Sequence, residues 1–501
     1  MAGRHFLSLL GTSNYSEITY RCDEGAVATK YIQEAVLKLK MLNERSFEDG
    51  DRITIFVTKE AYQRNWLDRD YTARELEQMK VAEVGEGTVR KRGLYSILQE
   101  AYGIGEESAR FIPLGATEDE LWDIFNIMYD EIQDEEELYV DITHSLRNIP
   151  IQMLSVIAYA RTLKNVNVAG IYYGAFEAKV QNDAGETEAP IFDLVTFLDI
   201  LDWSQAASSF VRYGNSDEIK ALFDIQKAKR RDSVADSYKV VRDIYDITQG
   251  LETSRGCHVP DRKCIPGGSV LNSYRSYEQN YENMREEAGK LEETQARMSR
   301  IDPLVKLFGV IDDKLRIFDV EDNLAFGHAA IKWAIDNGKA QQGFTALDET
   351  IKTYLCRRYE LNEYLEKHRE GIAKSICNLV NNEMKQKRSR DELTEEARLD
   401  IFRKWESGWE MRWGREQKGK GTETVAITPE QEREAARKLA MELPCELAEL
   451  TNAISSCRNS MNHFGYSNIY VFGCRNLCRD LKEYYERFQK MIALMEECEE
   501  E

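Results

Sequence analysis

Residues 138–163 read LYVDITHSLRNIPIQMLSVIAYARTL, and this stretch decides the fold class of the first part of the chain. It opens with LYVDIT (138–143), a short apolar run with the composition of a buried β-strand. It ends with IPIQMLSVIAYARTL (149–163), a strongly apolar segment that is long enough for a helix. The polar residues between the two therefore lie in a loop that joins a strand to a helix.

The same alternation extends over the first 200 residues. The predicted strands lie at 6–12, 53–58, 109–115, 138–143 and 166–174, and the predicted helices at 26–42, 120–132 and 149–163. Strands that alternate with helices predict βαβ units and a mostly parallel, Rossmann-like α/β sheet that is buried on both faces. Residues 174–195 follow as a predicted hairpin, with its tip at 183–185.

Polar residues and glycines follow the ends of the predicted strands. In parallel sheets, ligands bind beyond the carboxyl ends of the strands, so we expect these residues to meet at one edge of the sheet and bind a ligand. They are Gly11, Thr12, Ser13 and Asn14 after the first strand, Thr58 after the second, Thr143, His144, Ser145, Arg147 and Asn148 after the fourth, and Gly174 after the fifth.

Three common uses of such a pocket do not fit the sequence. The first strand is followed by GTSN rather than by the Gly-x-Gly-x-x-Gly of dinucleotide-binding folds, and the Gly-x-x-x-x-Gly-Lys-[Ser/Thr] of a P-loop does not occur. Asp141, His144 and Ser145 could compose a hydrolytic triad, but triad members normally come from separate elements. We therefore interpret Asp141 as a structural residue at a strand end.

The second part of the chain has a different character. With 501 residues the chain is too long for a single ordinary core, so we expect two domains, 1–200 and 201–501. From Trp203 onward the pattern is almost continuously helical, with apolar stripes in 203–211 and 481–495. Residues 385–425 are rich in charge and are predicted to be an insertion in this helical domain.

Composition excludes several classes of protein. The net charge of −21 argues against a surface that is coated by nucleic acid, and the basic clusters at 227–231, 385–390 and 412–421 are interpreted as solvated helix faces or loops. The ten cysteines lack paired CxxC spacing, so we expect reduced thiols and no metal site. Without a secretory signal or an apolar run of membrane-spanning length, a cytoplasmic protein with no membrane partner is expected.

A second group of polar residues lies near the end of the chain, in ISSCRNSMNHF (454–464). On a helix, Ile454, Cys457, Met461 and Phe464 would share one side, and the opposite side would present Arg458, Asn459, Asn462 and His463. Metal-free RNA cleavage needs a proton-transfer group of near-neutral pKa and a fixed cation for the phosphate, and His463 with Arg458 is the minimal pair. Because the two residues would be about 140° apart on one helix, a partner helix would have to bring them together. An ordinary polar helix surface is the alternative interpretation.

Together, the two groups resemble the CARF–HEPN ribonucleases that are associated with type III CRISPR systems. LSLLGTSNY (7–15) and DITHSLRNIP (141–150) are similar to the two nucleotide-contacting signatures of a CARF domain, and RNSMNH (458–463) is similar to the HEPN Arg-x-x-x-x-His motif, with Asn459 in its polar second position. Residues 333–355 resemble a helical segment of the same family. Many relatives have Gly where this chain has Ser145.

The resemblance implies a cyclic-oligoadenylate sensor, followed by a nuclease for single-stranded RNA that acts in antiviral defence. It implies cyclic tetra-adenylate as the expected activator, no metal cofactor, and a homodimer in which two copies of Arg458 and His463 form one site. Two rival hypotheses remain: a ligand-responsive adaptor or regulator without catalytic activity, in which 458–463 is only an interface helix, and a ring nuclease that acts in the sensor pocket.

Overall fold

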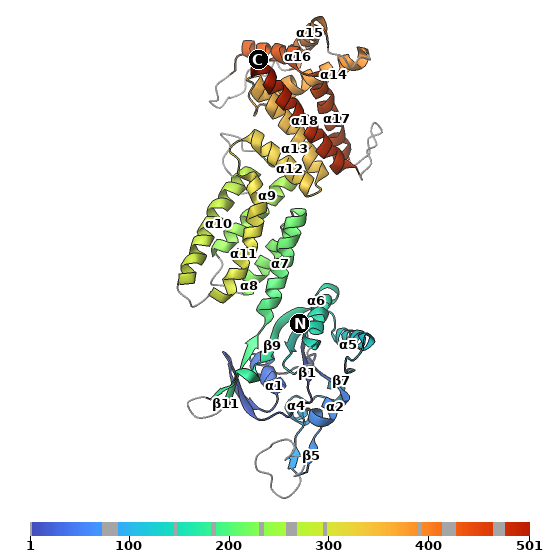
Figure 1. The fold of residues 1–501 in the computed structure, drawn as a ribbon, viewed down its shortest axis with the longest axis vertical. Helices are drawn as coiled ribbons and strands as arrows, with labels where there is room; N and C mark the ends of the chain where they lie inside the picture. The colour runs from blue at the N-terminus through green and yellow to red at the C-terminus, as the bar shows by residue number, and fades with distance from the viewer. Residues whose placement is uncertain are drawn as a thin grey trace. The chain divides into compact units, whose positions relative to one another are not determined.

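The computed structural model divides the chain into two compact units, Met1–Asp199 and Ile200–Glu501. It describes residues 3–72, 89–144, 148–181, 187–229, 235–256, 268–293, 298–387, 393–412, 427–463 and 476–500. Figure 1 shows an α/β fold in the first unit and helices in the second. The fold class predicted from the sequence, an α/β domain followed by an all-α domain, is therefore confirmed.

The first unit is built around a nine-stranded sheet with the order β3-β2-β11-β9-β8-β1-β4-β7, in which β10 (Val180–Gln181) pairs with β11. The pairs β9-β8, β8-β1, β1-β4 and β4-β7 are parallel, and the additions beyond β9 are mixed. The strands are β1 (Arg4–Leu10), β2 (Ile18–Cys22), β3 (Gly25–Thr29), β4 (Arg52–Val57), β7 (Ala109–Phe111), β8 (Glu137–Asp141), β9 (Asn167–Gly174) and β11 (Thr187–Asp193). A separate pair, β5 (Arg69–Tyr71) and β6 (Val89–Lys91), is antiparallel.

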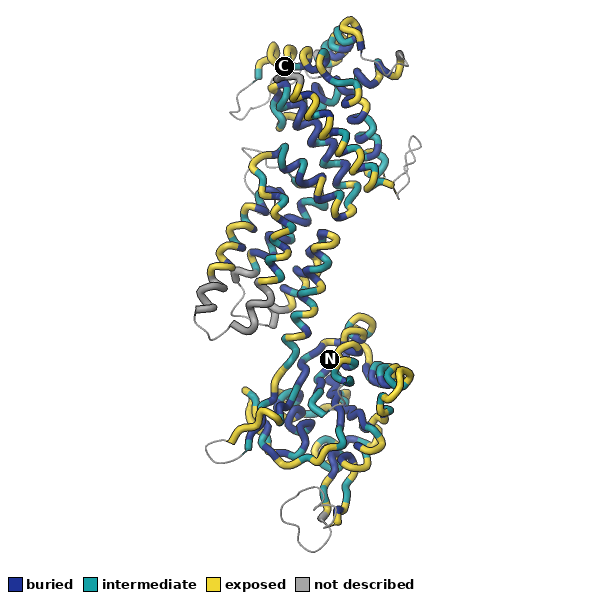
Figure 2. Tube along the Cα trace, viewed as in Figure 1, coloured by how far each residue is buried: buried dark blue, intermediate teal, exposed yellow. Residues whose placement is uncertain are grey.

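Helices cover both faces of this sheet. Successive side chains of β1 point to opposite faces, and because both sets include apolar residues, both faces must be covered. Phe6 and Leu10 pack in one core and Leu7 and Leu9 in the other, and every residue of β1 is buried (Figure 2). The first core is covered by α1 (Ile32–Val36), α2 (Lys59–Ala61) and α4 (Leu94–Tyr102), and the second by α5 (Glu118–Glu131) and α6 (Ile149–Lys164). π-Helical turns at 37–41 and 62–66 extend α1 and α2.

One local prediction is wrong. The residues predicted to begin the helix 26–42 form β3, the second strand of a hairpin with β2, and helical structure begins only at Ile32. Residues 26–29 read AVAT, a run that is equally compatible with a strand, and pairing with β2 decides between the two. In the predicted hairpin 174–195, β10 and β11 are indeed antiparallel, while its tip at 183–185 lies outside the described residues.

The second unit contains two helical cores. The first is formed by α7 (Val195–Tyr213), which crosses the division between the units, with α8 (Asp217–Lys229), α9 (Ala235–Glu252), α10 (Val270–Glu293), α11 (Met298–Leu315) and α12 (Asn323–Asp336). Trp203, Ala206, Ala207 and Phe210 of the predicted stripe are buried here, whereas Val211 is exposed. On α12, Trp333 faces this core and Ile331 faces the next, so α12 joins the two cores.

The second helical core contains α13 (Ala340–Arg358), α14 (Ser375–Lys387), α15 (Glu395–Arg412), α16 (Pro429–Glu442), α17 (Cys445–Asn462) and α18 (Leu477–Glu500). Thr428 begins α16 with a full capping box to Gln431. Within 385–425, predicted as a charged insertion, α15 buries Ile401 and Trp405 in the core, so this helix is an integral part of the unit. In the described ranges, no helix combines the length and apolar character that a membrane span needs.

Candidate functional sites

A pocket of about 350 Å³ opens at the carboxyl edge of the parallel strands. Strand β1 lies at the centre of the parallel strands: β4 and β7 follow on one side of it, and β8 and β9 on the other. Open α/β sheets bind ligands where the strand order reverses in this way. Six residues predicted from strand ends line the pocket, namely Gly11, Thr12, Ser13, Thr58, Thr143 and His144. The loops after β1, β4 and β8 therefore do meet at one site.

The loop after β1 is held by side chains from elsewhere in the unit. Asn65, which is buried, donates from Nδ2 to the carbonyl oxygens of Gly11 and Ser13, each at 2.9 Å. The hydroxyl of Tyr15 accepts a 2.9 Å hydrogen bond from the backbone N–H of Gly11. A Cβ at position 11 would lie 2.9 Å from that hydroxyl, so a larger residue would force either the loop or the Tyr15 side chain to shift.

The loop after β8 is organised by Asp141. Its fully buried carboxylate accepts hydrogen bonds from Ser8 Oγ at 2.6 Å, from Thr143 Oγ1 at 2.6 Å and from the Thr143 backbone N–H at 3.0 Å. Burial raises the pKa of Asp141, against these hydrogen bonds. Thr143 Oγ1 also accepts from the N–H of Gly174 at 2.8 Å. Thr143 and Gly174 are both predicted to contact a ligand. They are hydrogen-bonded to each other at the carboxyl ends of β8 and β9.

Among the described residues of this loop, His144 has a ring nitrogen without a hydrogen-bond partner. Its ring packs on that of Tyr15, with centroids 4.3 Å apart. Its Nε2 is buried and has no hydrogen-bond partner among the described residues. Burial lowers the pKa of His144 to about 4, so the ring is neutral at pH 7. A neutral imidazole with an unpaired buried nitrogen beside a pocket fits a ligand that supplies a polar group.

The remaining predicted residues lie around the pocket or outside the described ranges. Thr58 is the N-cap of α2 and accepts a hydrogen bond from the N–H of Ala61. Asn148 precedes α6 and makes no side-chain capping bond, while Asn14 is exposed and does not line the pocket. Ser145 and Arg147 are not among the described residues.

The sequence-based prediction missed Tyr15 and Asn65. Tyr15 is adjacent to the polar loop and could have been included, because an aromatic ring beside a polar loop is a common nucleotide contact. Asn65 gave no such signal, since it lies in the π-helical turn 62–66 and reaches the loop only through the fold.

The second predicted site lies at the end of α17. Arg458 projects from this helix toward α13, where its Nη1 donates a 2.6 Å hydrogen bond to Asp348 Oδ2. As the stripe prediction required, Ile454 and Cys457 are buried in the core. Phe464, the last member of that stripe, lies outside the described residues.

Asn459 and His463 are exposed on the outer side of the same helix end. His463 is the C-cap residue, and its backbone N–H bonds to the carbonyl of Asn459 at 2.9 Å. Within the described ranges, no hydrogen bond joins the side chains of Arg458 and His463. One chain therefore presents the two groups separately, as their helical spacing predicts.

Comparisons with known proteins show what the first unit is similar to. Residues 5–177 match the family model of the CARF domain of the CRISPR system endoribonuclease Csx1. The chain is also similar to the CRISPR-associated protein MJ1674 of Methanocaldococcus jannaschii, with 26% identity over 278 residues. That alignment covers 55% of this chain and 38% of the relative, so the chain spans much less than the relative's full length. The N-terminal unit is thus similar to a CARF domain, and the chain as a whole is similar to a CRISPR-associated protein over 55% of its length.

Proposed function

We propose that the protein is an endoribonuclease that cleaves single-stranded RNA without a metal ion, and that a cyclic oligoadenylate activates it in type III CRISPR defence. The CARF match over 5–177 supports the sensor part, because domains of this class bind cyclic oligoadenylates. The nuclease part rests on one observation: α17 presents an anchored Arg458 and an exposed His463 at the same end.

The pocket chemistry is suited to a ring of nucleotides. Tyr15 lines the pocket with an aromatic ring that packs on His144 and is suited to contact a base, and neutral His144 offers an unpaired Nε2 for a base or a ribose hydroxyl. Helix α6, of 16 residues, begins beside the pocket at Ile149, and the partial positive charge at its N-terminus favours a phosphate there.

At the nuclease site, the 2′-hydroxyl oxygen of the substrate attacks the adjacent phosphorus. One His463 imidazole accepts the 2′-hydroxyl proton, the protonated imidazole of the second copy of His463 donates a proton to the departing 5′-oxygen, and a 2′,3′-cyclic phosphate remains. Arg458 stabilises the negative charge that develops on the phosphoryl oxygens. Because one chain presents Arg458 and His463 separately, two copies of α17 would form the complete site.

The exposed face of α6 supports a homodimer. Every exposed residue on this helix is uncharged, and the set is Ile151, Leu154, Ser155, Ala158, Tyr159, Thr162 and Leu163 (Figure 2). An uncharged helix face with large exposed apolar side chains is typical of an interface. Since α6 begins at the pocket, a second copy packed on this face would place the two sensor pockets close together.

A single assay tests the proposed function. Fluorescent single-stranded RNA is incubated with the protein, with or without cyclic tetra- or hexa-adenylate, and with EDTA throughout. We expect cleavage only when a cyclic oligoadenylate is present, and its loss in His463→Ala with activator binding unchanged. Arg479→Ala, at an exposed site on α18, is the control and should cleave normally. Cleavage by His463→Ala would refute the catalytic assignment.

The same assay separates the rival functions. Degradation of the cyclic oligoadenylate without cleavage of RNA would indicate a ring nuclease. If neither molecule is cleaved, the protein would be an adaptor. Substitution of His144 or Arg147 should shift the activator dose-response to higher concentration while the dimer persists. An unchanged dose-response would contradict the assignment of the sensor pocket.

A further inference from the structure

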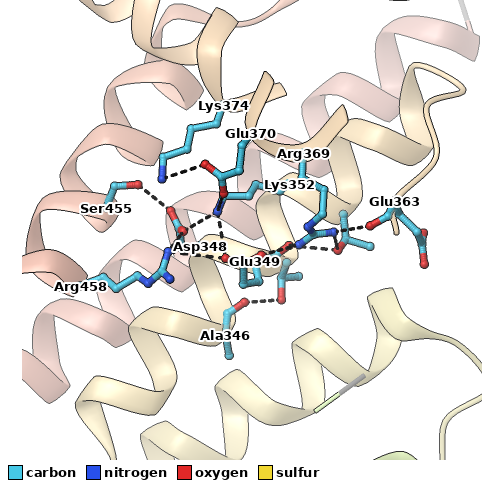
Figure 3. Close-up of polar contacts among 12 residues, drawn as sticks. Ala346, Asp348, Glu349, Lys352, Glu363, Arg369, Glu370, Lys374, Ser455 and Arg458 are labelled. Carbon is cyan, nitrogen blue, oxygen red and sulfur yellow. Dashed lines mark hydrogen bonds and ion pairs between the residues drawn. The ribbon is translucent and has the colours of Figure 1, made fainter. Parts of the chain in front are cut away.

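The guanidinium of Arg458 is held from inside the protein by a cluster of charged side chains (Figure 3). We call it the Arg458 cluster, and its members are Asp348, Glu349, Lys352, Arg369, Glu370, Lys374 and Arg458. Asp348 lies at its centre and is fully buried on α13. Its Oδ2 accepts from Arg458 Nη1 at 2.6 Å and from Lys352 Nζ at 2.9 Å, and its Oδ1 accepts from Ser455 Oγ at 2.6 Å.

Asp348 remains ionised in this environment. Burial alone would raise the pKa of its carboxyl group, but the charge of Lys352 and the hydrogen bond from Ser455 outweigh burial and lower the pKa. A fully buried carboxylate with three charged or polar donors makes short, directional bonds and leaves little freedom to the donors. The Arg458 guanidinium is therefore fixed in place by a rigid partner.

The cluster does not cancel the charge of Arg458. It contains three carboxylates and four cations, and Lys352 contacts all three carboxylates, so one positive charge is left within the group. The side chain of Arg458 is 25% exposed, more than those of Lys352, Arg369 and Lys374. In a chain of net charge −21, this local excess of positive charge would favour an anion beside Arg458.

The bonding of the guanidinium is also asymmetric. Nη1 points to Asp348, with Glu349 Oε1 at 3.5 Å, whereas Nε is buried without a partner among the described residues. We propose that Asp348 is a positioning residue, which occupies one N–H edge of Arg458 and so fixes the direction in which the exposed part of the guanidinium faces the scissile phosphate of RNA. This inference rests on the proposed ribonuclease function. It assigns Asp348, which lies 110 residues before Arg458 in the sequence, to the organisation of the nuclease site.

The decisive variant is Asp348→Asn. It keeps the size of the side chain and an acceptor for Ser455, and it leaves Lys352 two other carboxylates, Glu349 and Glu370, so we expect the fold to persist. A misplaced Arg458 should lower kcat about 10- to 100-fold with little change in KM. When Arg458 is already replaced by Ala, adding Asp348→Asn should lower kcat by less than about twofold further, because the two residues act as one unit.

Glu370→Gln is the matched control. It removes the Glu370 carboxylate from the same cluster. In the described structure this carboxylate contacts Lys352 and Lys374 and makes no contact with Arg458. We expect normal kcat and normal activator binding for this variant. Equal losses in Glu370→Gln and Asp348→Asn would show a general effect of the cluster and would overturn the positioning role.

A second measurement does not depend on RNA cleavage. Phenylglyoxal modifies accessible arginines, and peptide mass spectrometry reports the reaction at Arg458 separately from others. In Asp348→Asn the rate at Arg458 should rise several-fold, and in Glu370→Gln it should match the unmodified sequence. Equal rates in all three proteins would refute the inference even if the protein is a ribonuclease. A raised rate in a protein that cleaves no RNA would instead refute the proposed function and preserve the role of Asp348 in holding Arg458.

Discussion

Ser8 Oγ on β1 donates a 2.6 Å hydrogen bond to the buried carboxylate of Asp141 on β8. This contact adds a side-chain link between two paired strands whose loops help to line the pocket. Asp141→Ala would leave the hydroxyls of Ser8 and Thr143 without this acceptor, so we expect the free energy of unfolding to fall by about 2–4 kcal/mol. Asp141→Asn keeps an acceptor and should cost about 1 kcal/mol. Urea denaturation measures both variants, and equal losses would contradict this role.

The close approach of Gly11 to Tyr15 predicts a compensating pair of substitutions. Gly11→Ala would place a methyl group 2.9 Å from the Tyr15 hydroxyl and displace the loop that lines the pocket. We expect activator affinity to fall about tenfold, equivalent to about 1.4 kcal/mol. Removing the hydroxyl in the double variant Gly11→Ala/Tyr15→Phe should restore most of the affinity. Isothermal titration calorimetry with cyclic tetra-adenylate gives these affinities, and the absence of any recovery would exclude a clash as the cause.

The parallel part of the sheet could be predicted because its signal is local. A strand buried on both faces, such as β1, is apolar along its whole length, and a polar loop before an apolar helix marks its carboxyl end. The same reasoning placed the loops after β1, β4 and β8 at one edge. The hairpin of β2 and β3 escaped prediction because four residues, AVAT at 26–29, have no period of their own that separates strand from helix.

The contacts that organise the two sites could not be predicted, because they join residues that are far apart in the sequence. Asn65 reaches Gly11 across 54 positions, and Arg458 reaches Asp348 across 110. Residues 333–355 resemble a helical segment of the family, but that resemblance does not distinguish Asp348 from the other carboxylates of this acidic chain. Only the packing of α13 against α17 makes it a buried partner of Arg458.

His144 predicts a pH dependence of stability. Burial lowers its pKa to about 4, below the value of about 6.5 for an unfolded histidine, so the unfolded chain binds more protons between these values. The stabilising contribution of neutral His144 is therefore present above about pH 6.5 and is lost as the pH falls toward 4. We expect His144→Gln to lose less stability than the unmodified chain between pH 7 and pH 5 in urea denaturation. Parallel curves for the two proteins would contradict the burial of the ring.

The uncharged face of α6 predicts a dimer that one charge can disrupt. Ile151 is 70% exposed near the start of the helix, and Ile151→Arg would place a cation in the proposed interface. Light scattering coupled to size-exclusion chromatography should show a dimer for the unmodified protein and a monomer for this variant. Val180→Arg, at an exposed apolar position on β10, is the control and should remain a dimer. A dimer in both variants would exclude this face as the interface.

Lys352 is the residue on which the stability of the Arg458 cluster depends. Its side chain is 1% exposed, and its ammonium group contacts Asp348, Glu349 and Glu370. Burial alone would lower the pKa of Lys352, but the carboxylates of Glu349 and Asp348 outweigh it and raise the pKa. Lys352→Met would remove one of the two cations that contact the buried Asp348 carboxylate, and we expect it to lower the free energy of unfolding by about 3–5 kcal/mol at pH 7.

This loss should itself depend on pH, with a sign that the carboxylates determine. Lys352 lowers the pKa values of Asp348 and Glu349, so their ionised forms stabilise the fold above the unfolded values of about 3.9 and 4.3. As the pH falls through the lowered values, the carboxylates become protonated and this contribution disappears. The difference in stability between the unmodified protein and Lys352→Met should therefore be largest at pH 7 and shrink below about pH 4. Hydrogen exchange of the α13 peptide, measured across this range, localises the effect, and a difference that is constant with pH would show that lost packing rather than charge is responsible.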